Sequence, residues 1–152
     1  PWPLLHGVSW GVLPLVAGLF VLVDGLSQTG ALTALEALLA EGSAWSADAT
    51  AVLSGIGVAL GSNVINNLPA GLIVATIGHG AAVAPRVLEA LLVGVDLGPN
   101  LSVTGSLATI LWLAALRREN IRVGGWEFLR LGALVMPPAL LLALLALVLE
   151  PH

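Results

Sequence analysis

The segment Gly94-Val-Asp-Leu-Gly-Pro-Asn-Leu-Ser-Val-Thr-Gly-Ser-Leu-Ala-Thr109 combines a carboxylate, three glycines, a proline, an asparagine and several hydroxyls. Long apolar runs lie on both sides of it, and their length is typical of membrane helices. Because lipid offers no hydrogen bonds, a broken backbone at membrane depth is tolerated only inside protein or around a cavity. Transporters place their substrate and ions at interrupted helices of this kind. The segment therefore predicts part of a membrane transporter.

The composition places the whole chain in the lipid bilayer. Of its 152 residues, 58% are hydrophobic and only 9% are charged, and the mean hydropathy is +1.02. A soluble domain carries about 25% charged residues. We therefore expect an all-α polytopic membrane protein, multi-pass in the plasma (inner) membrane. The net charge of −4 argues against a nucleic-acid partner.

Several classes of chemistry have no support in the sequence. The absence of cysteine excludes disulfides, thiolate metal sites and cysteine nucleophiles. We find no nucleophile–base pair and no metal-ligand spacing such as HExxH, so we expect neither an enzyme nor a cofactor. The chain opens Pro1-Trp2-Pro3, without an initiating methionine or a basic n-region. We interpret it as a fragment or a processed chain without a signal peptide.

The apolar runs predict a single membrane domain over residues 1–152. Spanning helices are expected at 8–26 and 126–149, each long enough for the hydrocarbon core. The connector 27–46 has an apolar part too short to span, which favours an interfacial helix with Trp45 in the headgroup belt.

Residues 86–116 predict a broken transmembrane helix, with one half at 86–97, a break at 98–104 and a second half at 105–116. Four of the five arginines follow it, within residues 117–130. The positive-inside rule places this arginine loop in the cytoplasm.

Residues 47–80 allow two interpretations. Two apolar arms of roughly 15 and 11 residues flank a polar centre, and each arm is shorter than the roughly 20 residues of a spanning helix. The segment is either one spanning helix broken in the middle or a re-entrant hairpin whose polar tip reaches the membrane centre. A full crossing would place the connector 27–46 inside, although it has no arginine or lysine. We favour the hairpin, which gives three full crossings and an outer C-terminus.

The first polar group is Ser62, Asn63, Asn66 and Asn67, followed by Pro69. Asparagines inside an apolar arm cost free energy unless they find partners. Their carbonyls and amides can coordinate a cation or hydrogen-bond a neutral hydroxylated solute. The alternative is helix capping alone, which does not require three asparagines.

The second polar group is centred on Asp96. An intramembrane carboxylate is a functional site by default, and its burial favours the protonated form, as a proton carrier needs. Asn100, Ser102 and Thr104 line the predicted break, followed by Ser106 and Thr109. In the alternative interpretation, Asp96 caps the break or pairs with an arginine elsewhere in the complete protein.

Other polar residues are weaker candidates. Asp24 and Glu89 lie nearer the ends of their segments, which indicates interfacial positions. His79 lies between two glycines, as a loop residue does. The small residues Gly55 and Ala59 favour close approach of helices.

The two polar groups have the same pattern: an apolar half, a polar break and a second apolar half. Transporters with broken helices pair two such elements around one site and usually carry a second, inverted copy of the arrangement. The chain has one copy. We therefore expect one repeat of an inverted-repeat transporter, its C-terminal half, with the N-terminal half as partner.

At these residues the chain resembles the arsenical pump membrane protein family, the arsenite efflux permeases within the ion transporter superfamily. Asp96-Leu-Gly-Pro99 followed by Gly105-Ser-Leu-Ala-Thr-Ile-Leu-Trp112 is similar to the signature on that family's second-repeat broken helix. Asn66-Asn67-Leu68-Pro69 is similar to the family's polar hairpin tip. The resemblance covers roughly residues 53–149. Some family members carry lysine where Asn100 stands here.

The resemblance implies arsenite or antimonite efflux and arsenic resistance. Transport would be driven by inward proton movement or, with a cytosolic partner ATPase, by ATP. At neutral pH the substrate would be an uncharged trihydroxy species, which amides and hydroxyls can hold. By matching position, the substrate- or ion-binding residues would be Asn63, Asn66, Asn67, Asp96, Asn100, Ser102 and Thr104, with Asp96 as the proton-coupling group.

Three other functions compete with arsenite/proton antiport. A sodium/proton antiporter could use the same asparagines and Asp96. A carboxylate transporter would need cationic clamps, and neither break has a nearby lysine or arginine. A membrane scaffold would leave both polar breaks unexplained.

Overall fold

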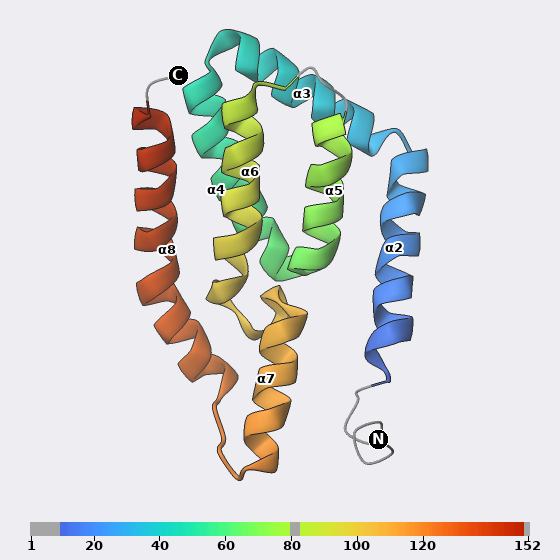
Figure 1. The fold of residues 1–152 in the computed structure, drawn as a ribbon, viewed down its shortest axis with the longest axis vertical. Coiled ribbons are helices and arrows are strands. Elements are labelled where there is room, and N and C mark those ends of the chain that lie inside the picture. Colours follow the sequence, from blue (N-terminus) through green and yellow to red (C-terminus); the bar gives the residue numbers. More distant parts are fainter. Residues whose placement is uncertain (1–9, 80–82, 151–152) are drawn as a thin grey trace.

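The computed structural model describes residues 10–79 and 83–150, and every regular element in these ranges is a helix (Figure 1). The prediction of an all-α chain is confirmed. The elements in chain order are α2 (Val12–Gln28), α3 (Ala31–Trp45), α4 (Ala47–Ile65), α5 (Asn67–His79), α6 (Pro85–Leu97), the short 3-10 turns η1 (Gly98–Leu101) and η2 (Val103–Gly105), α7 (Leu107–Arg118) and α8 (Gly125–Leu149).

The helices have the length and surface of membrane helices. In the described residues, α4 with 19 residues and α8 with 25 are long and apolar enough to cross a membrane. The pair α2 and α3, bent by 70°, makes a third candidate if it counts as one span. Large aliphatic side chains of α8, such as Leu134 at 72% and Leu142 at 66%, are exposed. An aliphatic surface this continuous requires lipid or protein around it, so the chain is a polytopic membrane protein.

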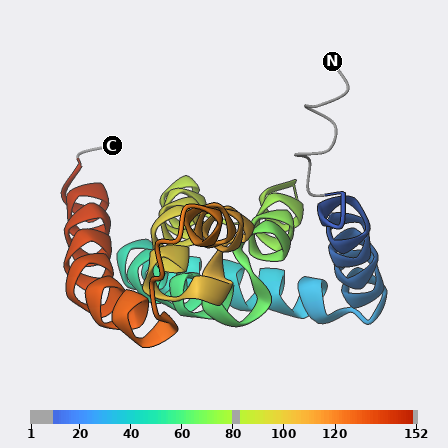
Figure 2. The ribbon, with the colours of Figure 1, turned by 90° about the horizontal axis from the view of Figure 1, so that it is seen from below.

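The elements are arranged between two ends of the molecule (Figure 1). At the upper end lie α3, the first turns of α4 and α6, and the last turn of α8. At the lower end lie the start of α2 and the loop between α7 and α8. We call the region of this loop, residues 117–130 with their four arginines, the arginine end. Seen from below in Figure 2, α2 and α8 lie at opposite edges with the other helices between them. The predicted boundaries Val8 and Gly80 fall outside the described residues.

The helices α4 and α5 form a hairpin that turns near the middle of the molecule (Figure 1). Ser46 starts α4 by accepting a hydrogen bond from the Ala49 amide at 3.2 Å. The turn is at Asn66, whose φ of 75° and ψ of 153° lie in a region that non-glycine residues rarely adopt. Such a conformation costs about 1–3 kcal/mol and persists only where its surroundings hold it. Both arms, of 19 and 13 residues, are longer than the sequence suggested.

The second interrupted element consists of α6, a non-helical stretch at 98–106 and α7. Pro85 begins α6, where its missing amide proton has no consequence. The second half begins at Leu107, two residues later than expected, because Ser106 adopts an extended backbone and accepts a hydrogen bond from the Ala108 amide at 3.2 Å. The helix α8 continues across Pro137 and Pro138, and its axis bends along its length (Figure 1).

Small residues bring α4 and α6 into backbone contact. Ala51 and Ala59 on α4 are 0% exposed, and Gly55 lies between them on the same face. A Cβ on Gly94 of α6 would lie 2.3 Å from the Gly55 carbonyl oxygen. Small residues at a helix contact allow the same close approach of backbones in other membrane helix pairs. The two helices that carry the polar groups are therefore held together by their backbones.

An ion pair closes the upper end of the molecule. Arg86, at the start of α6, pairs with Asp48 in the first turn of α4. Its Nη2 also donates to the Glu150 carbonyl oxygen at 2.8 Å, just beyond α8. The Arg86 side chain is 17% exposed. Three helix ends are thus joined at a point that the sequence analysis did not single out.

Candidate functional site

The polar tip of the hairpin, residues 62–67, meets the break at 98–106. Asn63 is the main link: its Nδ2 donates to the Ala59 oxygen at 2.8 Å and to the Gly98 oxygen at 2.9 Å. Its Oδ1 accepts from the Ser102 hydroxyl at 2.7 Å, and its backbone oxygen accepts from the Thr104 hydroxyl at 3.0 Å. The two hydroxyl oxygens lie 3.2 Å apart. Segments about 40 residues apart in sequence thus form one hydrogen-bonded cluster.

Asn66 makes a second link between the tip and the break. Its Nδ2 donates to the Thr104 carbonyl oxygen at 3.1 Å, and its Oδ1 accepts from the Leu68 amide at 3.3 Å. The side chain thereby satisfies the first turn of α5 while it holds the hairpin to the break. These bonds supply the surroundings that stabilise the unusual backbone at Asn66.

Three predicted site residues keep polar atoms open. No hydrogen bond involves the side chain of half-buried Asn67 within the described residues, and none involves the exposed carboxylate of Asp96. Asn100 is also exposed, and its Nδ2 donates to the Asp96 oxygen at 3.3 Å and the Leu97 oxygen at 3.0 Å. Asn100 therefore caps the end of α6 and keeps its side-chain oxygen available. The capping function that one interpretation gave to Asp96 belongs to Asn100.

Two further hydroxyls of the polar groups, those of Ser62 and Ser106, make hydrogen bonds within their own helices. Ser62 is 0% exposed, and its hydroxyl donates to the Ala59 oxygen of its own helix at 2.8 Å. Ser106 caps α7. The fully buried Ser62 hydroxyl is therefore not presented to a ligand.

Glycines allow the backbone to approach closely around this cluster. A Cβ on Gly98 would lie 2.3 Å from the Ala59 Cα, and one on Gly105 would lie 2.5 Å from the Pro99 oxygen. Gly132 of α8 is equally tight, since its Cβ would lie 2.6 Å from the Asn100 carbonyl oxygen. Gly132 was not predicted from the sequence, although a lone glycine in an aliphatic helix is a signal of close packing. The break is therefore supported from both α4 and α8.

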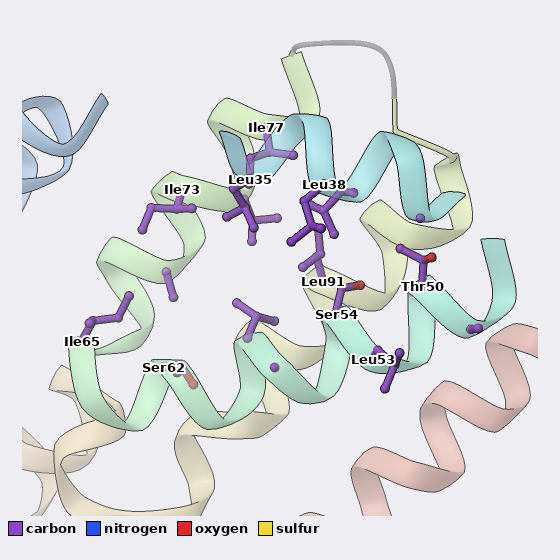
Figure 3. Close-up of a pocket in the computed structure, with 18 of the residues that line it drawn as sticks. Leu35, Leu38, Thr50, Leu53, Ser54, Ser62, Ile65, Ile73, Ile77 and Leu91 are labelled. Carbon is purple, nitrogen blue, oxygen red and sulfur yellow. The ribbon is translucent and has the colours of Figure 1, made fainter. Parts of the chain in front are cut away.

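A cavity of about 590 Å³ lies beside the hairpin, between α3, α4 and α5 (Figure 3). Figure 3 shows aliphatic side chains around it, among them Leu35, Ile73 and Leu91, with the hydroxyls of Thr50 and Ser54 toward one end. An apolar lining of this kind does not suit a hydroxylated or charged solute. The polar cluster of the tip and break is therefore the better candidate for a transport site.

The donor set defines which ligands fit. No group of three or more His, Cys, Asp or Glu side chains that could hold a metal ion occurs in the part of the chain that the structure describes. The open groups are amides, carbonyl oxygens and one carboxylate. Amides and carbonyls form hydrogen bonds with a small neutral solute that bears hydroxyls, and the carboxylate can bind and release a proton.

Comparisons with known proteins identify the family of the chain. The family model described as arsenical pump membrane protein matches residues 4–150. The arsenical pump membrane proteins of Escherichia coli K12 and Yersinia enterocolitica are each 31% identical to the chain, over 96% of its length. An uncharacterized transporter of Mycobacterium tuberculosis is 32% identical over 91% of the chain. No solved structure gives a significant match.

The chain spans only part of these relatives, since it covers 35% of the Escherichia coli protein and 34% of the Mycobacterium tuberculosis transporter. The match nevertheless extends over both polar groups and over every helix of the described fold. The chain belongs to the arsenical pump membrane protein family.

Proposed function

We propose that this chain forms one repeat of a transporter that exports arsenite or antimonite in exchange for protons. The observation that carries the proposal is the cluster of tip and break, in which Asn67, Asp96 and Asn100 keep polar atoms open beside a hydrogen-bonded frame. A polar site of this kind inside an apolar helical chain has a function by default.

The chemistry of the open groups favours an uncharged trihydroxy substrate. The Asn67 amide can both donate and accept, and the Asn100 side-chain oxygen can accept. Arsenite is a neutral hydroxylated species at neutral pH, so it requires hydrogen bonds and no counter-charge. The names of the Escherichia coli and Yersinia relatives, which refer to an arsenical pump, support the same substrate class.

Asp96 is the proposed proton-coupling group. Its carboxylate has no partner in the described residues and lies at the end of α6, beside the break. A carboxylate inside a membrane segment can bind and release a proton during transport. Alternate exposure to the two sides of the membrane would then load and release one proton in each cycle.

The exposed face of α6 indicates a partner. Glu89, Leu92 and Asp96 are exposed and follow one another at about one helical turn along one side of α6. The exposed Asn100 comes next, in η1. We propose that the portion of the transporter that this chain does not cover packs over this face and completes the site. We further propose placement in the plasma (inner) membrane, and treat a cytosolic ATPase as an optional energy-coupling partner.

The test is transport by the complete transporter in everted membrane vesicles. With a proton gradient, acidic inside, the vesicles should accumulate arsenite or antimonite, and a protonophore should abolish accumulation. Vesicles from cells without the transporter are the control.

Two results would contradict the proposal. Arsenite accumulation that requires ATP and survives the protonophore would replace proton antiport by an ATPase-driven pump. Sodium–proton exchange without any movement of arsenite would instead assign the chain to a cation antiporter, with the asparagines as sodium ligands.

A further inference from the structure

The strongest feature outside the candidate site is the arginine end. Arg117, Arg118, Arg122 and Arg130 are all exposed there, on the end of α7, the following loop and the start of α8 (Figure 1). No ion pair or hydrogen bond involves these four side chains within residues 10–79 and 83–150. The fifth arginine, Arg86, differs in each respect: it lies at the upper end and is paired with Asp48.

The charge of this segment opposes that of the whole chain. Residues 117–130 hold four arginines and only two glutamates, whereas the net charge of the chain is −4. Exposed guanidinium groups with no carboxylate partner attract anions, and their planar forks match phosphate oxygens in two-point contacts.

Apolar surface begins directly beside these charges. A hollow of about 520 Å³ is lined by Trp126, Glu127, Arg130, Leu131 and Leu134. Trp126 is 72% exposed, Leu131 64% and Leu134 72%. Indole rings of this kind lie at the headgroup level, and exposed leucines beyond them lie against acyl chains. The hollow therefore passes from a guanidinium to an aliphatic lining within a few turns of α8.

We propose that the arginine end binds anionic phospholipid. The phosphate of the headgroup contacts Arg130 and the neighbouring arginines, while one acyl chain lies along Leu131 and Leu134 beside the Trp126 ring. Basic clusters next to a membrane helix attract anionic lipids in this way. The arginines complement the charge of an anionic headgroup. A lipid fits better than a soluble partner because the apolar part of the hollow continues into the bilayer. Glu127 opposes the headgroup charge and lowers its affinity.

The experiment uses the transporter in nanodiscs, with Trp126 as the sole tryptophan of the preparation and all others replaced by phenylalanine. Brominated phosphatidylglycerol and brominated phosphatidylcholine are compared as quenchers of its fluorescence. Phosphatidylglycerol should associate about fivefold more strongly, as expected for one well-placed arginine. The ratio of phosphatidylglycerol to phosphatidylcholine association should fall towards one in a single variant that combines Arg117→Gln, Arg118→Gln, Arg122→Gln and Arg130→Gln. The same ratio should rise in Glu127→Gln.

A matched control is the same preparation with Trp45 as the sole tryptophan. Trp45 is 87% exposed at the opposite end, and the one arginine found there in the described structure is paired. It should be quenched equally by the two lipids. Equal quenching at Trp126, or a preference that survives removal of the four arginines, would overturn the proposal. A surface that instead retains a soluble ATPase without any lipid preference would do the same.

Discussion

Asn63 and Asn67 lie one helical turn apart in sequence, yet the fold gives them different tasks. Both amide protons of Asn63 are used, on the Ala59 and Gly98 oxygens, so it has no donor left for a substrate. Asn67 has a free side chain within the described residues. We therefore assign Asn63 to the frame that joins the tip to the break, and Asn67 to the ligand.

The first prediction separates these two tasks. Asn63→Ala should lower the free energy of unfolding by about 1–3 kcal/mol, because it removes the amide donor to the Gly98 oxygen and the acceptor of the Ser102 hydroxyl. Asn67→Ala should leave stability unchanged and weaken arsenite transport through a raised KM. Thermal unfolding in detergent measures the first effect, and vesicle transport measures the second. Equal destabilisation by the two variants would contradict the assignment.

The second prediction concerns Asp96. Asp96→Asn keeps the size of the side chain and removes its titration, so the variant should reach the membrane in normal amounts and lose proton-driven accumulation. Glu89→Gln is the matched control, since Glu89 lies on the same exposed face of α6, two turns nearer its start. It should transport like the wild type. Accumulation against a gradient by Asp96→Asn would show that another group couples the proton.

At the level of helices, the packing of α4 on α6 leaves no room for a methyl group. The third prediction is that Gly94→Ala destabilises the chain by roughly 1–3 kcal/mol, because its Cβ would lie 2.3 Å from the Gly55 oxygen. Gly57→Ala is the control on the same helix pair. Nothing lies within 4 Å of a Cβ at Gly57, and alanine favours a helix by about 0.5–1 kcal/mol over glycine.

The measurement is the unfolding temperature of each variant, together with the fraction recovered as a monodisperse sample. A Gly94→Ala variant as stable as the wild type would mean that α4 and α6 separate easily, and that the tip and break are not held in one frame.

The order of elements followed from the sequence, while the partners of the polar groups did not. Apolar length and the polar residues from Gly98 onward were sufficient to predict α6, a break and α7. The start of α7 was placed at Gly105 instead of Leu107, since nothing local shows that Gly105 packs against the Pro99 oxygen. Which donor and acceptor atoms of Asn63 are occupied depends on residues 35 and 39 positions away, and no local pattern contains that information.

The fourth prediction concerns the whole molecule: the side of the membrane on which each of its two ends lies. The chain has no cysteine, so single cysteines can report the side of the membrane. If α4 and α5 form a re-entrant hairpin, Ala44→Cys at the end of α3 and Glu119→Cys after α7 lie on opposite sides. A membrane-impermeant maleimide should label Ala44→Cys from outside the cell and Glu119→Cys only in everted vesicles.

Both positions are exposed, so access of the reagent is not limited by packing. Labelling of both cysteines from the same side would favour the other interpretation, in which residues 47–80 cross the membrane once as a broken helix.

The hydrogen bonds between tip and break also constrain the order in which the helices reach their final positions during synthesis. Every one of them joins residues 35 to 41 positions apart. At a synthesis rate of roughly 5–20 residues per second, the asparagines leave the ribosome about two to eight seconds before their partners. During that interval they need water or the insertion machinery as a substitute. The hairpin therefore takes its final depth after α6 has followed it, as a late step of biogenesis.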